Sequence, residues 1–143
     1  MTGHTPGMTL DEANAYYAKH ANPDSAFNAE FVEMAPGRAV LRLDVKGAHL
    51  RPGGMVSGPT QMTLADATGF MTVAATMGLI EMAVTANLTI TFLRPCRAER
   101  IFGEGRILKA GRKQAVVDVI LKTEDDDRPV SHAVMTFALP LEN

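Results

Sequence analysis

The sequence is poor in cysteine and histidine and has no tryptophan. Cys96 is the only cysteine among 143 residues, so no disulfide can form within the chain. A single thiol favours a reducing compartment, and we expect a cytoplasmic protein. The four histidines are scattered and share no metal-ligand spacing with Cys96. We therefore expect no metal site and no resident cofactor.

The sequence also lacks an excess of basic residues and a long uncharged apolar run. Its formal net charge of -2 and pI of about 6.1 argue against a nucleic-acid partner. The most apolar stretch, residues 62–82, contains Asp66 and Glu81, so we expect a buried helix and no membrane span. The N-terminus has no basic segment followed by an apolar one, so we expect no secretory signal.

Length and composition predict one domain over residues 1–143. A chain of this size with 46% hydrophobic residues can enclose a core of its own. Residues 1–8 are rich in Gly, Pro and Thr, so a flexible arm is expected there. An N-terminal helix is expected within residues 9–21, with Leu10 to His20 as its body and Thr9 as its N-cap.

Alternating apolar and polar side chains predict strands before and after one long helix. The expected strands cover residues 26–34, 38–45, 83–93, 98–109, 114–122 and 129–139. The helix runs from Gly58 to Met77 and stops at Gly78. It is apolar nearly all round, so a sheet should wrap it. The predicted fold class is α+β, with a curved antiparallel sheet around a long central helix.

Two connecting segments are expected to be exposed. Residues 46–56 form a loop rich in Gly and Pro, in which His49 should lie on the surface. The acidic run 124–127 is interpreted as a solvated hairpin turn and not as a metal site.

Asp66 is the one formal charge between Pro52 and Ile80. Burying a carboxylate among apolar side chains costs several kcal/mol unless it is paired or hydrogen-bonded. No basic residue follows or precedes it within a helical turn or two. An acid in such a place is a candidate functional residue. A structural acid, bonded to the backbone or to a hydroxyl such as that of Thr63 or Thr85, is the alternative.

Gly58 and Pro59 begin the long helix. Free backbone N–H groups and the positive end of the helix dipole favour an anion at this position. Pro59 suits the first turn because an N–H there would lack a helical partner. The Gly58 N–H is therefore a candidate donor to a developing oxyanion, unless Gly58 serves only the geometry of the helix start. Ser57 is either an N-cap or a hydroxyl that holds substrate or water.

The run Gly54-Met55-Val56-Ser57-Gly58-Pro59, followed by Leu64-Ala65-Asp66, resembles the hotdog-fold thioesterases of the phenylacetate-degradation (PaaI-like) type. Their pattern is G-x-V-H-G-G and then L-x-D, with the Asp nine residues after the His. Residues 86–95 are similar to the family's next strand, and residues 110–113 to its basic hairpin. The resemblance covers residues 25–140. Ser57 stands at the family's His, Pro59 at its second Gly, and Arg51 at the Asn of several members.

The resemblance implies hydrolysis of an acyl-CoA thioester. Asp66 would be the general base for water or the nucleophile, Gly58 would supply the oxyanion-hole N–H, and Thr85 would help to hold water or the acid. Coenzyme A would enter only as part of the substrate. The cations that could meet the substrate's carbonyl or phosphates are Arg51, Arg94, Lys109, Arg112 and Lys113.

Asp66 lies eight residues after Gly58, or about 12 Å along one helix at 1.5 Å per residue. One helix cannot bring both groups to the same thioester bond, so two protomers must share the site. This agrees with the family, and a homodimer, assembling further to a homotetramer, is expected. Two other functions stay open. A non-catalytic acyl-CoA or acyl-carrier binding protein is favoured by Ser57 and Arg51, whereas a hydratase or dehydratase ranks lower because no histidine accompanies Asp66.

Overall fold

The computed structural model describes residues 6–20 and 27–140. Its elements, in chain order, are α1 (Leu10–His20), β1 (Ala29–Ala35), β2 (Arg38–Asp44), the 3-10 turn η1 (Gly47–His49), β3 (Leu50–Arg51), β4 (Met55–Val56), α2 (Gly58–Met77), β5 (Val84–Phe92), β6 (Arg100–Ala110), β7 (Gln114–Thr123) and β8 (Ser131–Ala138). The bounds of both helices agree with the sequence prediction. The strands differ from it by a few residues at their ends, and the predicted start at residue 26 lies outside the described residues.

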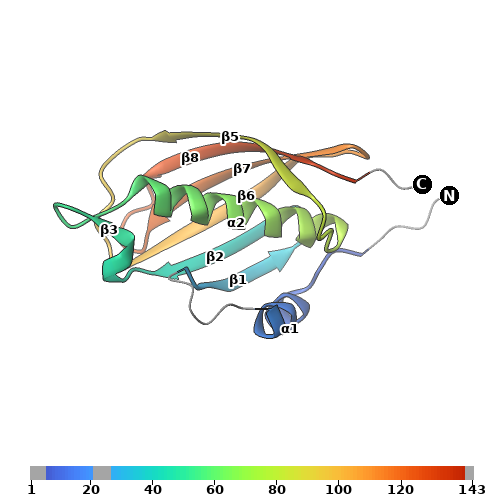
Figure 1. Cartoon of the computed structure of the whole chain (residues 1–143), viewed down its shortest axis with the longest axis horizontal. Helices are drawn as coiled ribbons and strands as arrows, with labels where there is room; N and C mark the ends of the chain where they lie inside the picture. The colour runs from blue at the N-terminus through green and yellow to red at the C-terminus, as the bar shows by residue number, and fades with distance from the viewer. Residues whose placement is uncertain (1–5, 21–26, 141–143) are drawn as a thin grey trace.

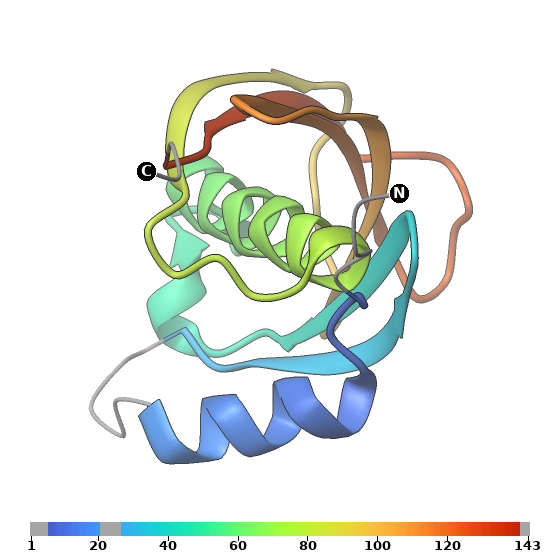
Figure 2. The ribbon, with the colours of Figure 1, turned by 90° about the vertical axis from the view of Figure 1, so that its right-hand side faces the viewer.

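Six strands form one antiparallel sheet in the order β1-β2-β6-β7-β8-β5. The sheet curves around α2, and α1 lies outside it, next to β1 (Figures 1 and 2). β1 and β5 are the two edge strands. The predicted arrangement of a curved sheet around a long helix is therefore confirmed.

α1 begins with a reciprocal pair of hydrogen bonds. The Glu12 N–H donates to Thr9 Oγ1 at 3.2 Å, and the Thr9 N–H donates to Glu12 Oε1 at 3.0 Å. This capping box satisfies two backbone donors that the helix itself leaves free. The hydrogen bond that the Thr9 N–H donates to the carboxylate lowers the pKa of Glu12. Thr9 is thus the N-cap that the sequence predicted.

α2 packs onto β6 through close contact between threonines and glycines. The hydroxyls of Thr68 and Thr72 each donate to the carbonyl four residues earlier, at 2.7 Å, so they need no partner in the sheet. A Cβ on Gly103 would overlap Thr68 Oγ1, and one on Gly105 would overlap Thr72 Oγ1. The absence of a side chain at these two positions of β6 is therefore what lets the helix approach the sheet.

One stripe of α2 remains uncovered in a single chain. Met62 and Thr63 are exposed, and Asp66, Ala67 and Phe70 are half-buried. The expectation that the sheet would wrap the whole helix therefore holds for most of its circumference but not for this stripe. The reason is that α2 has few contacts with β5, the edge strand that borders it, and no described element lies beyond.

Two residues predicted to lie in exposed or flexible segments are buried. The Met8 N–H donates to the Ala74 carbonyl at 2.8 Å, and Met8 is buried, so the expected flexible arm is wrong for this residue; residues 1–5 lie outside the described part. His49 is buried as well, because its Nδ1 accepts from the Lys46 N–H at 2.9 Å and closes η1. Neither described helix is both long and apolar enough to cross a bilayer.

Replacing Gly105 by Ala should destabilise the fold by about 1–3 kcal/mol, because the added methyl overlaps Thr72 and forces the helix away from β6. Urea unfolding measures the effect. Gly47→Ala is the matched control, because nothing lies within 4 Å of its Cβ position and its backbone is unstrained. Combining Gly105→Ala with Thr72→Ala should cost less than the sum of the two changes. A strictly additive result would contradict the packing argument.

Candidate active site

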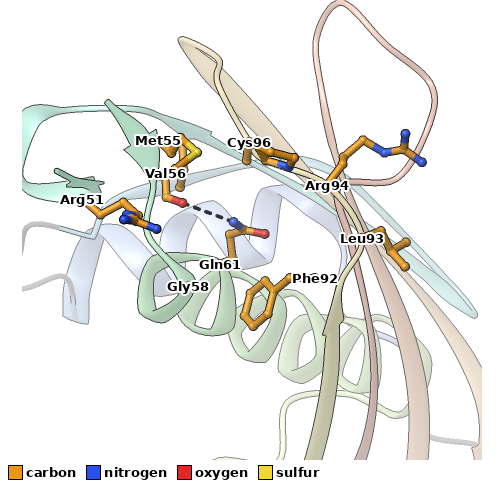
Figure 3. A pocket seen from close by; sticks show the side chains of 10 residues that line it. Arg51, Met55, Val56, Gly58, Gln61, Phe92, Leu93, Arg94 and Cys96 are labelled. Atoms are coloured by element: carbon orange, nitrogen blue, oxygen red, sulfur yellow. Dashed lines mark hydrogen bonds between the residues drawn. The ribbon is translucent and has the colours of Figure 1, made fainter. Parts of the chain in front are cut away.

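A pocket of about 520 Å³ opens beside the N-terminal turn of α2. It is bounded by the start of the helix, by the β3–β4 loop, and by the segment that follows β5 (Figure 3). Its lining is mostly apolar, with two arginines and one amide. The lining residues are Arg51, Met55, Val56, Gly58, Gln61, Phe92, Leu93, Arg94, Pro95 and Cys96.

The backbone donors of the first turn of α2 are almost all used. Ser57 Oγ accepts from the Thr60 N–H at 3.2 Å, and the Ser57 carbonyl accepts from the Gln61 N–H at 3.1 Å. Pro59 has no N–H to satisfy. Within the described residues, the Gly58 N–H is left without an acceptor, at the positive end of a 20-residue helix and on the wall of the pocket. The turn therefore presents one donor to an anionic oxygen.

The loop before α2 holds this turn in place. The Ser57 N–H donates to the His49 carbonyl at 2.9 Å, and the Val56 N–H donates to the Cys96 carbonyl at 2.9 Å. The second bond ties the helix start to the segment after β5. Both walls of the pocket are thus connected by backbone hydrogen bonds, which fixes the position of the Gly58 donor.

Asp66 lies two turns further along α2 and contacts β5. The Thr85 hydroxyl donates to Asp66 Oδ1 at 2.6 Å, a charge-assisted hydrogen bond. The Thr63 hydroxyl instead donates to the Pro59 carbonyl at 3.0 Å, so it is not the partner of the acid. Of the two hydroxyls that the sequence suggested as partners of Asp66, those of Thr63 and Thr85, only that of Thr85 donates to the carboxylate.

Asp66 is only half-buried in the isolated chain, which corrects the expectation of a carboxylate enclosed by apolar side chains. Its neighbour on the stripe, Met62, is 42% exposed, and Thr85 is exposed on the edge strand. Asp66 also does not line the pocket of Gly58. Because these groups lie about 12 Å apart along one helix, a single chain does not bring them to one bond.

The predicted cations fall into two separate groups. Arg51 and Arg94 line the Gly58 pocket, and neither forms an ion pair with a carboxylate of the described residues. Arg94 is oriented by its Nε, which donates to the Pro129 carbonyl at 2.8 Å. The Arg51 Nε donates to the Pro52 carbonyl at 3.2 Å, and its guanidinium lies at the exposed rim (Figure 3).

Lys109, Arg112 and Lys113 lie at the far end of the molecule. The β6–β7 hairpin that carries them sits beside the C-terminus of α2, where the Gly37 N–H donates to Thr76 Oγ1 at 3.0 Å and the Ile107 N–H donates to the Gly37 carbonyl at 2.9 Å. Gly58 is at the opposite end of this helix (Figure 1). One chain therefore does not place the basic hairpin at its own pocket.

Comparison with known proteins places the chain in a family. The profile of the thioesterase superfamily matches residues 53–130, the segment that runs from the pocket loop to the start of β8. A "Putative esterase" of Saccharolobus solfataricus is 31% identical over 98 residues, which cover 68% of this chain and 69% of that protein. The chain belongs to the thioesterase superfamily. Thioester hydrolysis is the general chemistry that this membership supports.

Solved structures agree with the assignment. A "putative thioesterase" from Silicibacter sp. TM1040 is 34% identical, covers 97% of this chain and 99% of its own, and superposes with a TM-score of 0.80. A Streptococcus mutans protein solved with acetyl CoA bound has the same fold, at 22% identity and a TM-score of 0.72, over 87% of this chain and 98% of its own. The predicted hotdog fold of the superfamily is confirmed.

Gln61, Phe92 and Cys96 are among the pocket residues that the sequence did not predict as part of the site. Gln61 is the one amide in the apolar helix and shares its buried face with Leu64, Ala65 and Thr68, a pattern that could have marked it. Phe92 and Cys96 carried no such signal. Burial raises the pKa of the Cys96 thiol, so it stays protonated and is a poor nucleophile.

Ser57 acts as an N-cap, and this role predicts how its variants behave. Ser57→Ala should lower the free energy of unfolding by about 0.5–2 kcal/mol, because it leaves the Thr60 N–H without its acceptor. Ser57→Asp restores an acceptor and should recover most of the loss in thermal or urea unfolding. If Ser57→Ala unfolded like the parent chain, the cap would contribute nothing, and the hydroxyl would then serve a ligand only.

Proposed function

We propose that this protein hydrolyses an acyl-CoA thioester to a free acid and CoA. The observation that carries the proposal is the Gly58 N–H, left unpaired at a helix N-terminus inside an apolar pocket. Such a donor stabilises the oxyanion that forms when a thioester carbonyl is attacked. Superfamily membership supports the reaction, and the acetyl CoA of the Streptococcus mutans structure supports the substrate class.

A second copy of the chain would complete the site. Exposed large apolar side chains gather on β5, on the loop before it, and on the open stripe of α2; they are Met62, Met82, Val84, Phe92 and Leu93. Asp66 and Thr85 lie within this surface. Two copies related by a two-fold axis, with their α2 helices antiparallel, would bring Asp66 of each copy toward Gly58 of the other. Pairing of such dimers into a homotetramer is the larger assembly that the family resemblance implies.

The chemical steps then divide between the protomers. The thioester carbonyl oxygen accepts from the Gly58 N–H of one copy, while Asp66 of the other takes a proton from water. The water oxygen bonds to the carbonyl carbon, and the oxyanion is held by the Gly58 N–H. The C–S bond then breaks, the electron pair leaves with sulfur, and the proton returns from Asp66 to the thiolate. In the alternative route Asp66 attacks the carbon itself, and water hydrolyses the resulting anhydride.

Thr85 is the positioning residue for the acid. Its hydroxyl holds Oδ1 of Asp66 at 2.6 Å and leaves Oδ2 for water or for the thioester carbon. Arg51 and Arg94 at the rim of the pocket would receive anionic or carbonyl groups of the substrate. With the two α2 helices antiparallel, the basic hairpin of one copy would also lie at the same end of the dimer as Gly58 of the other copy. There Lys109, Arg112 and Lys113 could bind the nucleotide phosphates of CoA. The cytoplasm is the location that we propose, because one free thiol suits a reducing compartment.

A non-catalytic acyl-CoA binding protein is the second candidate. Ser57 and Arg51 stand where the family resemblance places His and Asn, and the Ser57 hydroxyl is engaged as an N-cap. A tight complex with acyl-CoA that releases no thiol would favour this candidate. Thiol release from a panel of acyl-CoAs therefore separates the two functions.

Asp66→Asn should lower kcat for thioester hydrolysis by about 10²–10⁴-fold, because the amide can neither take the proton of water nor attack. The Thr85 hydroxyl can still donate to the amide oxygen, so the fold should be preserved. Thiol release with a chromogenic disulfide measures kcat, and thermal unfolding controls for stability. Full activity in a folded Asp66→Asn protein would show that the acid is structural.

Mixed dimers test whether two chains share the site. Gly58→Pro removes the N–H and is compatible with the first helical turn, since Ser57 already has extended backbone. Its expected loss is about 10²–10³-fold in kcat. Gly58→Ala keeps the N–H and adds a Cβ at the same position beside Phe92, so it is the matched control. Co-expressed Gly58→Pro and Asp66→Asn chains should regain activity, because a mixed dimer holds one intact site. Absence of any regain in purified mixed dimers would show that Gly58 and Asp66 of different chains do not share a site.

Val84→Glu on β5 should prevent dimer formation and abolish activity together, because it places a charge on the apolar edge. Val84 is 57% exposed in the single chain. Val32→Glu on the other edge strand, β1, is the matched control, since Val32 is 44% exposed and lies away from this surface. Analytical ultracentrifugation gives the mass. A Val84→Glu protein that remains dimeric and active would rule out this interface.

A further inference from the structure

Gln61 presents an unusual polar group to the Gly58 pocket. Its side chain lines the pocket and is only 4% exposed (Figure 3). Its Nε2 donates to the Val56 carbonyl at 3.3 Å, and its Oε1 is buried without a hydrogen-bond partner. A buried acceptor of this kind costs free energy in the empty protein, and a methionine or leucine would avoid that cost.

The orientation of the amide is set by its neighbour. Turning the amide over would direct Oε1 at the Val56 carbonyl, so that two acceptors would face each other. The oxygen therefore points away from Val56, toward the side of the pocket where Phe92 and Cys96 lie (Figure 3). Apart from the rim arginines, the remaining pocket side chains are apolar, and the Cys96 thiol makes no hydrogen bond to it.

Gln61 stands close to the proposed reaction centre. It follows Gly58 by three residues, a rise of about 4.5 Å along the helix. A thioester carbonyl bound at the Gly58 N–H would thus place the next few atoms of the ligand near Gln61. The thioester group itself has no hydrogen-bond donor, so the donor must come from a substituent. The CoA end leads toward the exposed rim and Arg51, which leaves the acyl end for the side of the pocket next to Gln61.

We propose that Gln61 determines acyl specificity: its Oε1 accepts a hydrogen bond from a hydroxyl that the acyl group carries close to the thioester carbonyl. The favoured substrates are therefore hydroxyacyl thioesters. This inference rests on the proposed function, because it takes the Gly58 N–H as the site of the carbonyl.

Phe92 lines the same part of the pocket as Gly58 and Gln61. A Cβ on Gly58 would come within 3.4 Å of the Phe92 ring, so the ring covers the start of α2. Phe92 ends the edge strand and is 47% exposed, so little packing opposes a turn of its ring. The proposal requires that a turn of this ring gives the substrate access to the Gly58 N–H and to the Gln61 oxygen.

The test compares two substrates that differ by one hydroxyl, butanoyl-CoA and 3-hydroxybutanoyl-CoA, the latter as each enantiomer. The parent enzyme should prefer one hydroxylated enantiomer in kcat/KM. Gln61→Met keeps an unbranched side chain of similar size and removes the acceptor, so it should reduce this preference by about tenfold or more. Met55→Leu is the control, since it reshapes the pocket without touching an acceptor and should change both rates alike. Thermal unfolding checks that Gln61→Met folds.

Two kinetic outcomes overturn the inference. If Gln61→Met lowers kcat/KM equally for both substrates, the donor is an amide of the pantetheine arm, common to every acyl-CoA. If kcat/KM changes for neither substrate, the Gln61 amide serves only as a hydrogen-bond donor to the Val56 carbonyl and has no role in specificity.

Binding separates this inference from the proposed function. Analogues with a methylene between sulfur and carbonyl bind without turnover, and calorimetry gives Kd for the hydroxylated and plain forms. A preference for the hydroxylated analogue that Gln61→Met abolishes supports the role of Gln61, even if no thioester is hydrolysed. Hydrolysis without any such preference upholds the proposed function and rejects the role of Gln61.

Discussion

The free backbone N–H of Gly58 is the group on which the candidate site depends. Every helix leaves donors unpaired at its first turn, and this chain accounts for nearly all of them. The Thr60 N–H donates to the Ser57 hydroxyl, the Ser57 N–H donates to the His49 carbonyl, and Pro59 has no N–H. The donor that remains opens into an apolar pocket, where a hydrogen bond to an oxyanion competes little with water. Capping of the other donors therefore leaves the Gly58 N–H as the group that can bind an oxyanion, and no additional catalytic side chain is needed for this.

The position of Asp66 gives this protein its second constraint. The helix that carries Gly58 carries the acid as well, about 12 Å further on and directed at the edge strand instead of the pocket. Rigid helix geometry forbids the two groups from meeting within one chain. The exposed stripe of α2 and the apolar edge of β5 surround Asp66, so the surface suited to a second copy also contains the acid. Assembly and chemistry are therefore coupled in the proposed mechanism, and a monomer would have two half-sites.

Much of the fold could be predicted from local patterns. Both helix bounds follow from caps and stops, Thr9 and Ser57 at the starts and Gly78 at the end of α2, where φ is 85°. Strand alternation located the six long strands to within a few residues. Packing contacts distant in sequence were harder to foresee. Met8 is buried because it bonds to the end of α2, and His49 because its ring closes a 3-10 turn, and neither partner is marked by periodicity.

The sequence by itself determined the two chemical groups, a carboxylate in an apolar helix and a donor at that helix's start, because helix caps and charge placement are local properties. Only the tertiary structure decided which hydroxyl holds the acid, that the basic hairpin lies at the opposite end of α2 from Gly58, and that Gln61 faces the pocket with an unpaired oxygen. These facts depend on which strand comes to lie against which face of the helix. The curvature of the whole sheet sets that neighbourhood, and no short segment encodes it.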